Sequence, residues 1–351
     1  MALATLQNIR VAGLASAVPR QIVSNLEYDQ VPEEKRQRIV KFTGIQYRRV
    51  GPRELCTSDL CEAAAKRLLD DLGWRREEVG AVVFVSQTFD YFFPVTAQSL
   101  QARLGLPKEC LAFDVNLGCS GYTYGLYILG HLMEAAGIKR GLLLTGDATK
   151  SDLMTDPSSA VIFGNGGSAT ALELSESGKP IYFEAGSDGA GYKVIYIPDG
   201  GGRSPFTAES FVKKPVETGG TRDATDIILD GSEIMNFALR ELPASVKRLL
   251  EFAEQRDVAG MDAFVFHQAN LLINTQVARK LGLKPEQTPT SLFDFGNTSS
   301  ASIPITITTK LRERISAEPM KLVLAGFGIG LSWASAYWEP DRIVCPELVE
   351  V

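Results

Sequence analysis

Cys119 lies in the stretch NLGCSGYTYGL, between the apolar run 111–115 and a helical pattern over 119–137. The glycines at 118 and 121 allow a sharp turn and leave room for a substrate beside the backbone. A thiol at the N-terminus of a helix lies near the positive end of the helix dipole, which should lower its pKa from about 8.5 toward 7. The resulting thiolate is a nucleophile for acyl transfer. We therefore interpret Cys119 as a catalytic nucleophile rather than a buried structural cysteine.

The sequence holds only two histidines that could accompany this thiol. His131 lies 12 residues along the same predicted helix, too far to reach Cys119, and is expected at the surface or in packing. His267 ends the apolar run 262–267, and Asn297 lies in the turn DFGNTSSAS. A neutral imidazole and an amide both donate hydrogen bonds without adding charge. Such a pair could hold the oxygen of the enolate that forms when a carboxylated thioester loses CO₂. The glycine-rich turn GFGIG (326–330) could direct a backbone N–H toward the oxygen of an acyl thioester.

An internal repeat predicts that these residues share one site. VFVSQ (83–87) returns as FVFHQ (264–268), and the Leu-Gly-Leu of 104–106 returns at 281–283. The Phe-Asp of 113–114 returns at 293–294, and GLLLTGD (141–147) as MKLVLAGF (320–327). Each pair is separated by about 180 residues, half of the 351-residue chain, which is far longer than a solenoid unit. The repeat predicts two similar α/β halves, 1–178 and 179–351, with the site at the seam between them.

The expected elements follow the same pattern, because apolar runs alternate with helical patterns as in βα units around parallel strands. We expect strands, buried on both faces, at 80–86, 111–115, 141–147, 262–267 and 321–327. Helical patterns cover 57–72, 94–104, 119–137, 230–256, 270–281 and 299–316. The Gly- and Pro-rich stretch between about 186 and 225 has no counterpart in the first half, and we expect it to form a lid or a channel wall.

Composition favours a globular enzyme and argues against nucleic-acid-binding, secreted, membrane and metal-binding proteins. Hydrophobic residues make up 45% and charged residues 22% of the chain, as in ordinary globular enzymes. The net charge of −6 argues against a nucleic-acid partner. We expect no secretory signal, no membrane segment and no metal, since the five cysteines show no zinc spacing. Reduced thiols are consistent with a cytoplasmic protein. Basic residues cluster between 35 and 53, either as a solvated helix face or as a docking patch for an acidic partner or a phosphate.

At these residues the chain resembles β-ketoacyl-ACP synthase III and the wider thiolase-fold condensing enzymes. The matching stretches are FDVNLGCSGYTYGL, VIFGNGGSAT, FHQAN, FGNTSSASIP and GFGIGLSW. The resemblance implies an α/β fold of the thiolase type, duplicated in five αβαβα layers. It implies that Cys119 carries the acyl group, that His267 and Asn297 promote decarboxylation, and that no cofactor is needed. It also implies an oxyanion hole formed by the backbone N–H groups of Cys119 and Ile329.

The resemblance further implies partners and a binding path. The partners are an acyl carrier protein, acyl-CoA thioesters or both, and a second copy of the chain in a homodimer. The acyl pocket would include Leu229 and Phe93, with Phe93 reaching the partner's acyl tunnel. The substrate entrance would include Arg38, Phe42, Gly231, Ser232 and Asn270.

Several positions depart from the family pattern at the nucleotide end of the substrate. Arg38 and Phe42 stand where a tryptophan and an arginine would clamp the CoA adenine, before Thr-Gly-Ile at 43–45. The segment DPSSAV (156–161) lacks an expected arginine, Leu272 and Asn236 replace expected basic residues, and Ile329 replaces a glycine. We therefore expect a specialised enzyme that takes carrier-bound or unusual acyl groups rather than one that primes with acetyl-CoA.

Other interpretations are weaker but distinct. A papain-like protease has the same Cys, His, Asn order, but its Cys-Gly-Ser-Cys motif and a place for the duplication are missing. A Rossmann enzyme needs a G-x-G-x-x-G turn, which VAGLASAVP does not supply. Two alternatives remain open: an acyltransferase or non-decarboxylating ketosynthase that couples two acyl thioesters, and a non-catalytic thiolase-fold partner subunit.

Overall fold

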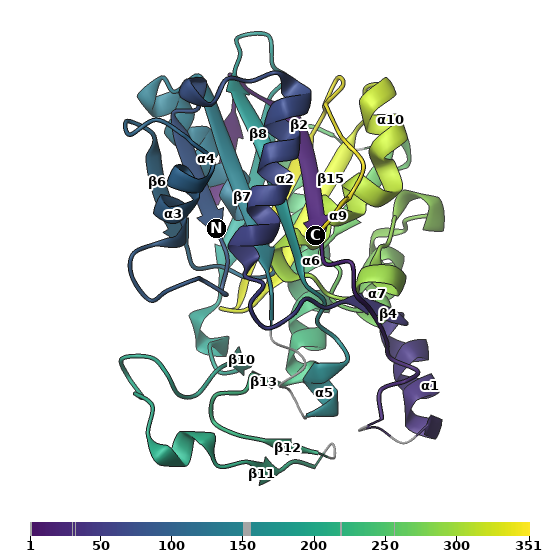
Figure 1. The fold of residues 1–351 in the computed structure, drawn as a ribbon. Helices are drawn as coiled ribbons and strands as arrows, with labels where there is room; N and C mark the ends of the chain where they lie inside the picture. Colours follow the sequence, from purple (N-terminus) through teal and green to yellow (C-terminus); the bar gives the residue numbers. More distant parts are fainter. Residues whose placement is uncertain (1, 30, 32, 150–155, 218–219, 256) are drawn as a thin grey trace.

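The computed structural model describes residues 2–29, 31, 33–149, 156–217, 220–255 and 257–351 (Figure 1). Its first sheet has six strands in the order β17-β2-β8-β7-β5-β6. The strands are β2 (Ile9–Val18), β5 (Ala81–Val85), β6 (Leu111–Val115), β7 (Arg140–Asp147), β8 (Gly166–Leu174) and β17 (Val349–Glu350). β6, β5 and β7 run parallel, so their carboxyl ends lie at one edge of the sheet.

The second sheet has five strands in the order β1-β9-β16-β15-β14. They are β1 (Ala2–Leu6), β9 (Ile181–Ser187), β14 (Ala263–Phe266), β15 (Leu322–Gly328) and β16 (Ser332–Trp338). The parallel pair β14 and β15 corresponds to β5 and β7 of the first sheet. The chain ends cross between the sheets, because β1 pairs with β9 and β17 pairs with β2. The division into halves at residue 178 stays a prediction.

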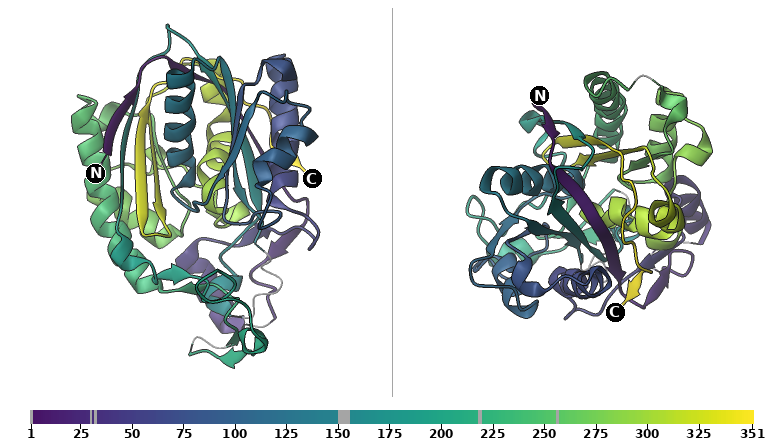
Figure 2. Two further views of the ribbon diagram at one scale, coloured as in Figure 1. Left: turned by 90° about the vertical axis from the view of Figure 1, so that its left-hand side faces the viewer. Right: turned by 90° about the horizontal axis from the view of Figure 1, so that it is seen from above.

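Helices cover both faces of each sheet. The central layer holds α4 (Gly121–Ala136), α9 (Ser302–Thr306), the π-helical η7 (Ile307–Leu311) and α10 (Arg312–Ala317). α2 (Thr57–Leu72) and α3 (Thr96–Arg103) pack on the outer face of the first sheet, and α6 (Gly231–Phe252) and α7 (Leu271–Leu281) on that of the second. Figure 2 shows α4 between the two sheets.

Apolar side chains that alternate between the two faces of each strand form the cores between these layers. Leu143 of β7 faces the central core, whereas its neighbours Leu142 and Leu144 face α2. On β15, Leu324 faces the central core and Val323 faces α6. Side chains of successive strand residues point to opposite faces, so each sheet needs helices on both sides. The five αβαβα layers of the thiolase type are thereby confirmed.

Three expectations about elements need correction. The run 111–115 forms β6, but this strand lies at the edge of its sheet and Leu111 is 46% exposed, so it is not buried on both faces within one chain. Phe293–Asp294, which the repeat pairs with β6, lies instead in the short helix α8 (Leu292–Phe295). The single helix expected over 299–316 is divided into η6 (Ser299–Ala301), α9, η7 and α10.

The stretch after β9 forms an excursion, residues 189–230, that extends from the layered body next to α5 (Pro157–Ala160) (Figure 1). It holds two small sheets, β10 (Ile195–Tyr196) with β13 (Ile228–Leu229) and β11 (Lys214–Pro215) with β12 (Thr221–Arg222). α1 (Glu33–Thr43) and the pair β3 (Ile22–Ser24) and β4 (Tyr47–Arg49) lie at the same end. The remaining short helices are η1 (Arg76–Glu78), η2 (Gly189–Gly191), η3 (Ala208–Phe211), η4 (Val258–Gly260) and η5 (Pro285–Gln287). Among the described residues, no helix is long and apolar enough to span a bilayer.

Candidate active site

Cys119 lies in the turn that connects β6 to α4, two residues before the helix begins at Gly121. The side chain is buried, and the end of β15 packs directly against it. A Cβ added at Gly328 would lie 3.1 Å from Sγ of Cys119, which only a glycine avoids. The neighbouring Ser120 hydroxyl hydrogen bonds with that of Ser332 at 2.7 Å, which ties the nucleophile's turn to β16 of the other sheet.

The pKa of the Cys119 thiol is raised, not lowered. Burial raises the pKa of Cys119 to about 12, and the charge of Asp147 adds to the rise. The Ser299 hydroxyl, 3.9 Å from Sγ, acts in the opposite direction but does not offset burial. The expectation of a lowered pKa is therefore wrong for this structure. The thiol of Cys119 is neutral, because removing the sulfur from water disfavours its charged form.

His267 follows β14 and is buried beside the ring of Phe327, at a centroid distance of 5.6 Å. Burial lowers the pKa of His267 to about 3, so the imidazole is neutral. Its Nδ1 lies 2.7 Å from the hydroxyl of Ser302, which already accepts a hydrogen bond from the backbone N–H of Gln268. The backbone of Ser299 also hydrogen bonds with the imidazole. In the tautomer in which Ser302 donates to Nδ1, the ring proton is on Nε2 and can be donated to a ligand.

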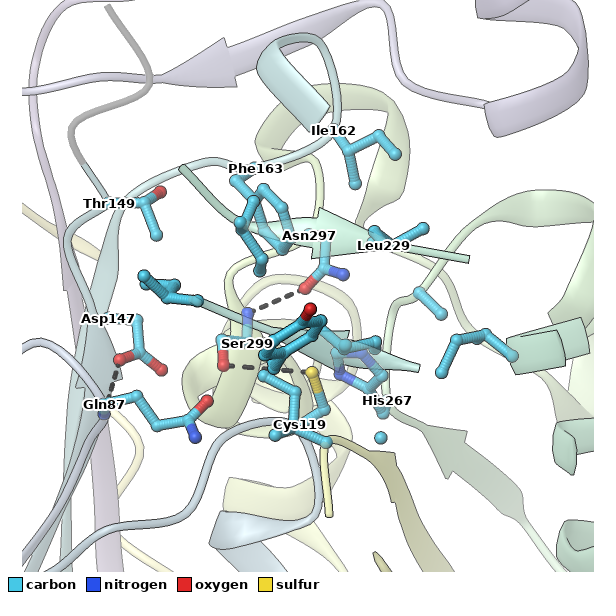
Figure 3. Close-up of a pocket in the computed structure, with 18 of the residues that line it drawn as sticks. Gln87, Cys119, Asp147, Thr149, Ile162, Phe163, Leu229, His267, Asn297 and Ser299 are labelled. Atoms are coloured by element: carbon cyan, nitrogen blue, oxygen red, sulfur yellow. Dashed lines mark hydrogen bonds between the residues drawn. The ribbon is translucent and has the colours of Figure 1, made fainter. Parts of the chain in front are cut away.

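Asn297 is held in one orientation by the turn that carries it. Its Oδ1 accepts the backbone N–H of Ser299 at 2.8 Å, so its amide N–H groups are free to donate (Figure 3). The main chain of Asn297 pairs with Ile162 and Gly164, and Ser299 adopts a φ of 50°, which is rare for a residue with a side chain. The strained turn places the serine hydroxyl at the thiol and the asparagine amide in the same cavity.

Cys119, His267 and Asn297 line one pocket of about 520 Å³ (Figure 3). The predicted triad is therefore brought together at the carboxyl ends of the parallel strands, where α/β sheets bind ligands. Residues 195–197, 225–227 and 229 of the excursion line the pocket, so this stretch forms a channel wall. No group of three or more potential metal ligands occurs among the described residues.

Comparisons with known proteins show the family of the chain. A family model described as 3-oxoacyl-[acyl-carrier-protein (ACP)] synthase III matches residues 113–189, and the model of its C-terminal part matches residues 253–339. The beta-ketoacyl-[acyl-carrier-protein] synthase III of Caldanaerobacter subterraneus subsp. tengcongensis is 32% identical, over 93% of this chain and 96% of that protein. The chain belongs to the 3-oxoacyl-[acyl-carrier-protein] synthase III family.

Solved structures of this synthase III family are similar throughout. A 3-oxoacyl-(acyl-carrier protein) synthase from Burkholderia xenovorans LB400 has a TM-score of 0.91 at 37% identity, covering 100% of this chain and 99% of that one. The priming β-ketosynthase of the R1128 polyketide biosynthetic pathway has a TM-score of 0.80 at 26% identity, covering 97% and 98%. The synthase III relationship therefore spans both sheets and the seam between them.

Of the other residues expected from the synthase III pattern, some line the pocket and some do not. Leu229, Gly231, Asn270 and Ile329 line the pocket, and the side chain of Asn270 caps α7 by accepting the N–H of Ile273. Ser232 lies next to Gly231 but is exposed and does not line the cavity.

Three further positions lie outside the pocket of the single chain. Arg38 and Phe42 are exposed on α1 and stack on each other, with the guanidinium carbon 5.5 Å from the ring centre. Phe93 is 86% exposed, in the loop before α3. That Phe93 enters the acyl tunnel of a partner subunit stays a prediction.

Sequence reasoning missed the residues that support the triad. Ser299 and Ser302 belong to the run SSAS after Asn297, which was a visible signal of hydroxyl groups beside the site. Gln87, Asp147 and Thr149 also line the pocket. Gln87 and Asp147 lie in the repeated runs 83–87 and 141–147, but nothing in the sequence showed that these side chains face Cys119.

Proposed function

We propose that this synthase III-family protein catalyses a decarboxylative Claisen condensation. An acyl group is first transferred to Cys119 and is then attacked by the carbanion of a malonyl-type carrier thioester. The observation that carries the proposal is the presence of a neutral imidazole, His267, and an oriented amide, Asn297, in the pocket of a buried cysteine. A general base for hydrolysis would instead need a histidine that takes up a proton near neutral pH.

The first half-reaction is a thiol–thioester exchange. The sulfur of Cys119 bonds to the acyl carbon, the carbon–sulfur bond of the donor breaks, and the proton lost by Cys119 leaves on the donor thiol. Backbone N–H groups of Cys119 and Ile329 are the proposed donors to the carbonyl oxygen during this transfer. Such oxyanion contacts are typically worth a factor of about 10²–10³ in rate.

The second half-reaction forms the carbon–carbon bond. The malonyl-type thioester loses CO₂, and its thioester oxygen becomes an enolate oxygen held by Nε2–H of His267 and the amide of Asn297. The α-carbon then attacks the acyl carbonyl, and the sulfur of Cys119 departs as a thiolate that takes up a proton from water. Two uncharged donors suit this step, because they stabilise the developing charge without reprotonating the carbanion.

Three substitutions test the proposed roles of Cys119 in acylation and of His267 and Asn297 in decarboxylation. Cys119→Ala is expected to abolish acylation and condensation. His267→Ala and Asn297→Ala are expected to accept an acyl group on Cys119 but to release CO₂ from a labelled extender at least about 100-fold more slowly. The measurements are intact-protein mass and CO₂ release. Normal decarboxylation in either variant, or an acyl adduct on Cys110 or Cys56 with Cys119→Ala still active, would contradict the assignment.

The same experiment separates the alternative functions. An acyltransferase or non-decarboxylating ketosynthase would acylate Cys119 and give product without release of CO₂. A non-catalytic partner subunit would form no adduct with any thioester. The polar support of His267 and Asn297 favours the condensing enzyme, because a scaffold has no need of oriented donors in a buried pocket.

We further propose that the enzyme works as a homodimer and in the cytoplasm, in fatty acid synthesis or a related polyketide pathway. The exposed aromatic loop at 89–93 and the open edge of β6 support a dimer. The five cysteines are all unpaired, which supports a reducing compartment. The exposed pair on α1 in place of an adenine clamp supports a carrier-protein donor over free CoA thioesters.

A further inference from the structure

The pocket has a polar end beside the nucleophile that the condensation does not use. In Figure 3, Gln87, Asp147 and Thr149 lie on one side of Cys119, and His267 and Leu229 lie on the other. Apolar side chains of Ile195, Ile197, Ile227 and Ile273 line the same pocket. The side with His267 and Leu229 holds one of the proposed decarboxylation donors and suits the arm of a thioester substrate, so the side with Gln87, Asp147 and Thr149 receives the acyl group. Leu229, which was expected in the acyl pocket, then lies on the arm side.

Asp147 has unfilled hydrogen-bonding capacity on that side. Only 3% of the residue is exposed, and its Oδ1 accepts hydrogen bonds from Ser86 Oγ, the Gln87 N–H and Thr88 Oγ1 at 3.0, 2.8 and 3.0 Å. Its Oδ2 is buried and has no hydrogen-bond partner in the described part of the chain. The hydroxyl of Ser299 approaches the carboxyl and helps to hold down its pKa, which burial raises, without completing a bond of ordinary geometry to Oδ2.

Thr149, two residues after Asp147, also has an unpaired polar atom. Its Oγ1 is also buried and has no partner in the described part of the chain. Two unsatisfied polar atoms in one pocket wall are unusual, because native proteins pair nearly all such groups. Leaving each of them unpaired destabilises the empty pocket, and a substrate group that binds there can supply the missing hydrogen bond.

The fold also makes room for polar groups at this end. Gly118 has no side chain, and a Cβ there would collide with Oε1 of Gln87. The amide of Gln87 therefore lies close to the backbone of Gly118, next to Cys119. Ile162 and Phe163 add apolar surface to the same pocket. The acyl end thus suits a short hydrocarbon with one polar substituent, and a plain alkyl chain would leave Oδ2 of Asp147 and Oγ1 of Thr149 unpaired.

We infer that the acyl group carried by Cys119 bears a hydroxyl group near its carbonyl, which hydrogen bonds with Asp147 and Thr149. A hydroxyl both donates and accepts, so it fits the carboxyl group and the threonine hydroxyl together. The enzyme is then a condensing enzyme for short hydroxyacyl thioesters. This inference rests on the proposed function, because it needs Cys119 to be acylated.

The test compares acyl groups that differ by one oxygen. Rates of Cys119 acylation are measured by intact-protein mass with 2-hydroxybutyryl, 3-hydroxybutyryl and butyryl thioesters on the same carrier. Hydrogen bonds to charged groups are worth enough to expect one hydroxyacyl group to react about 10- to 100-fold faster than butyryl. Butyryl transfer as fast as both hydroxyacyl transfers would overturn the inference and leave the proposed function intact. Failure of every thioester to acylate Cys119 would instead refute the proposed function.

Two variants test whether Asp147 and Thr149 cause the preference for hydroxyacyl groups. Thr149→Val keeps the shape of the side chain and removes its hydroxyl, and Asp147→Asn keeps the acceptor for the three donors and removes the charge. In each, the hydroxyacyl-to-butyryl rate ratio is expected to fall by about 3- to 10-fold. Thr5→Val, in β1 and away from the pocket, is the matched control and should keep the wild-type ratio. If Asp147→Asn fails to fold, Thr149→Val decides alone, and an unchanged ratio in Thr149→Val would overturn the inference.

Discussion

At the scale of single residues, Cys119 and His267 are both neutral near pH 7. Cysteine proteases keep a thiolate beside an imidazolium, which requires the thiol to have the lower pKa. Here the order is reversed, because burial raises the pKa of Cys119 to about 12 and lowers that of His267 to about 3. The same three residue types therefore serve a different chemistry. In the proposed reaction, the thiol loses its proton only as the thioester reacts, and the histidine acts as a hydrogen-bond donor.

This ionisation state predicts the pH dependence of thiol reactivity. Below its pKa, the thiolate fraction of a cysteine rises tenfold for each pH unit, and the thiolate is the reactive form. Because the pKa of Cys119 is raised to about 12, its alkylation by iodoacetamide should rise about tenfold per unit from pH 7 to 9, without a plateau. Peptide mapping of the carbamidomethyl group on Cys119 measures the rate. Cys119→Ser should lose this modification, and a plateau below about pH 8 would show a stabilised thiolate instead.

At the scale of elements, the end of β15 sets the geometry around the sulfur. Gly328→Ala would place a methyl group 3.1 Å from Sγ and 2.7 Å from Cβ of Cys119, both closer than ordinary contacts. Either the strand end or the nucleophile's turn must shift, so we expect acylation at least about tenfold slower and a loss of about 1–3 kcal/mol of stability. Gly189→Ala in η2 is the matched control, since an added Cβ there meets nothing within 4 Å. Equal acylation rates in both variants would show that this contact is not needed.

The sequence predicts the elements around the site better than it predicts their packing. The helix over 57–72 and the strand over 111–115 agree with α2 and β6 at both ends, because periodicity and a cap define them locally. The helix over 299–316 is broken near its start, where Ser299 takes a positive φ to bring its hydroxyl to Cys119. That distortion depends on tertiary contacts and leaves no periodic signal. The site triad was predictable because strand ends and glycine turns are local, whereas the pKa of Cys119 depends on burial by distant segments.

At the scale of the whole molecule, β6 and the loop beside it are apolar but uncovered. Phe89, Tyr91, Phe92 and Phe93 are 43%, 67%, 72% and 86% exposed, and Leu111 of the neighbouring edge strand is 46% exposed. Contiguous apolar surface with an unpaired strand edge is typical of an isologous interface. The sequence pattern of a strand buried on both faces would then hold for β6 in the dimer. An acyl pocket completed by the partner's Phe93 would join the two sites through this surface.

We therefore predict a dimer in solution. Sedimentation at about micromolar concentration should give twice the chain mass, and Phe92→Glu should shift the protein toward monomer because an interface core rejects an unpaired charge. Phe206→Glu is a matched control, since Phe206 is also 50% exposed but lies in the excursion. A wild-type monomer at that concentration would remove the basis for this prediction.

The charge and shape of the entrance side predict which donor acylates the enzyme. An adenine clamp needs an aromatic face and cations that reach phosphates, but Phe42 is covered in part by Arg38, and Arg36 donates to the backbone carbonyls of Val31 and Leu26. Losing a stacking partner and charge-assisted phosphate bonds should each weaken CoA binding by about 1–3 kcal/mol. An acidic carrier protein needs only a basic surface, which the exposed Lys35 and Lys41 of α1 supply.

Acylation of Cys119 should therefore be about 10-fold or more faster from an acyl carrier protein than from the CoA thioester of the same acyl group at equal concentration. The double variant Lys35→Glu, Lys41→Glu should slow the carrier reaction more than the CoA reaction, and this difference should shrink at high salt, because ions screen exposed charges. Lys66→Glu on α2 is the matched control, since Lys66 is exposed on the outer face of the first sheet. A faster reaction from CoA in the wild type would mean that the nucleotide is bound by other residues, and that the substitutions on α1 moved the CoA site instead of removing it.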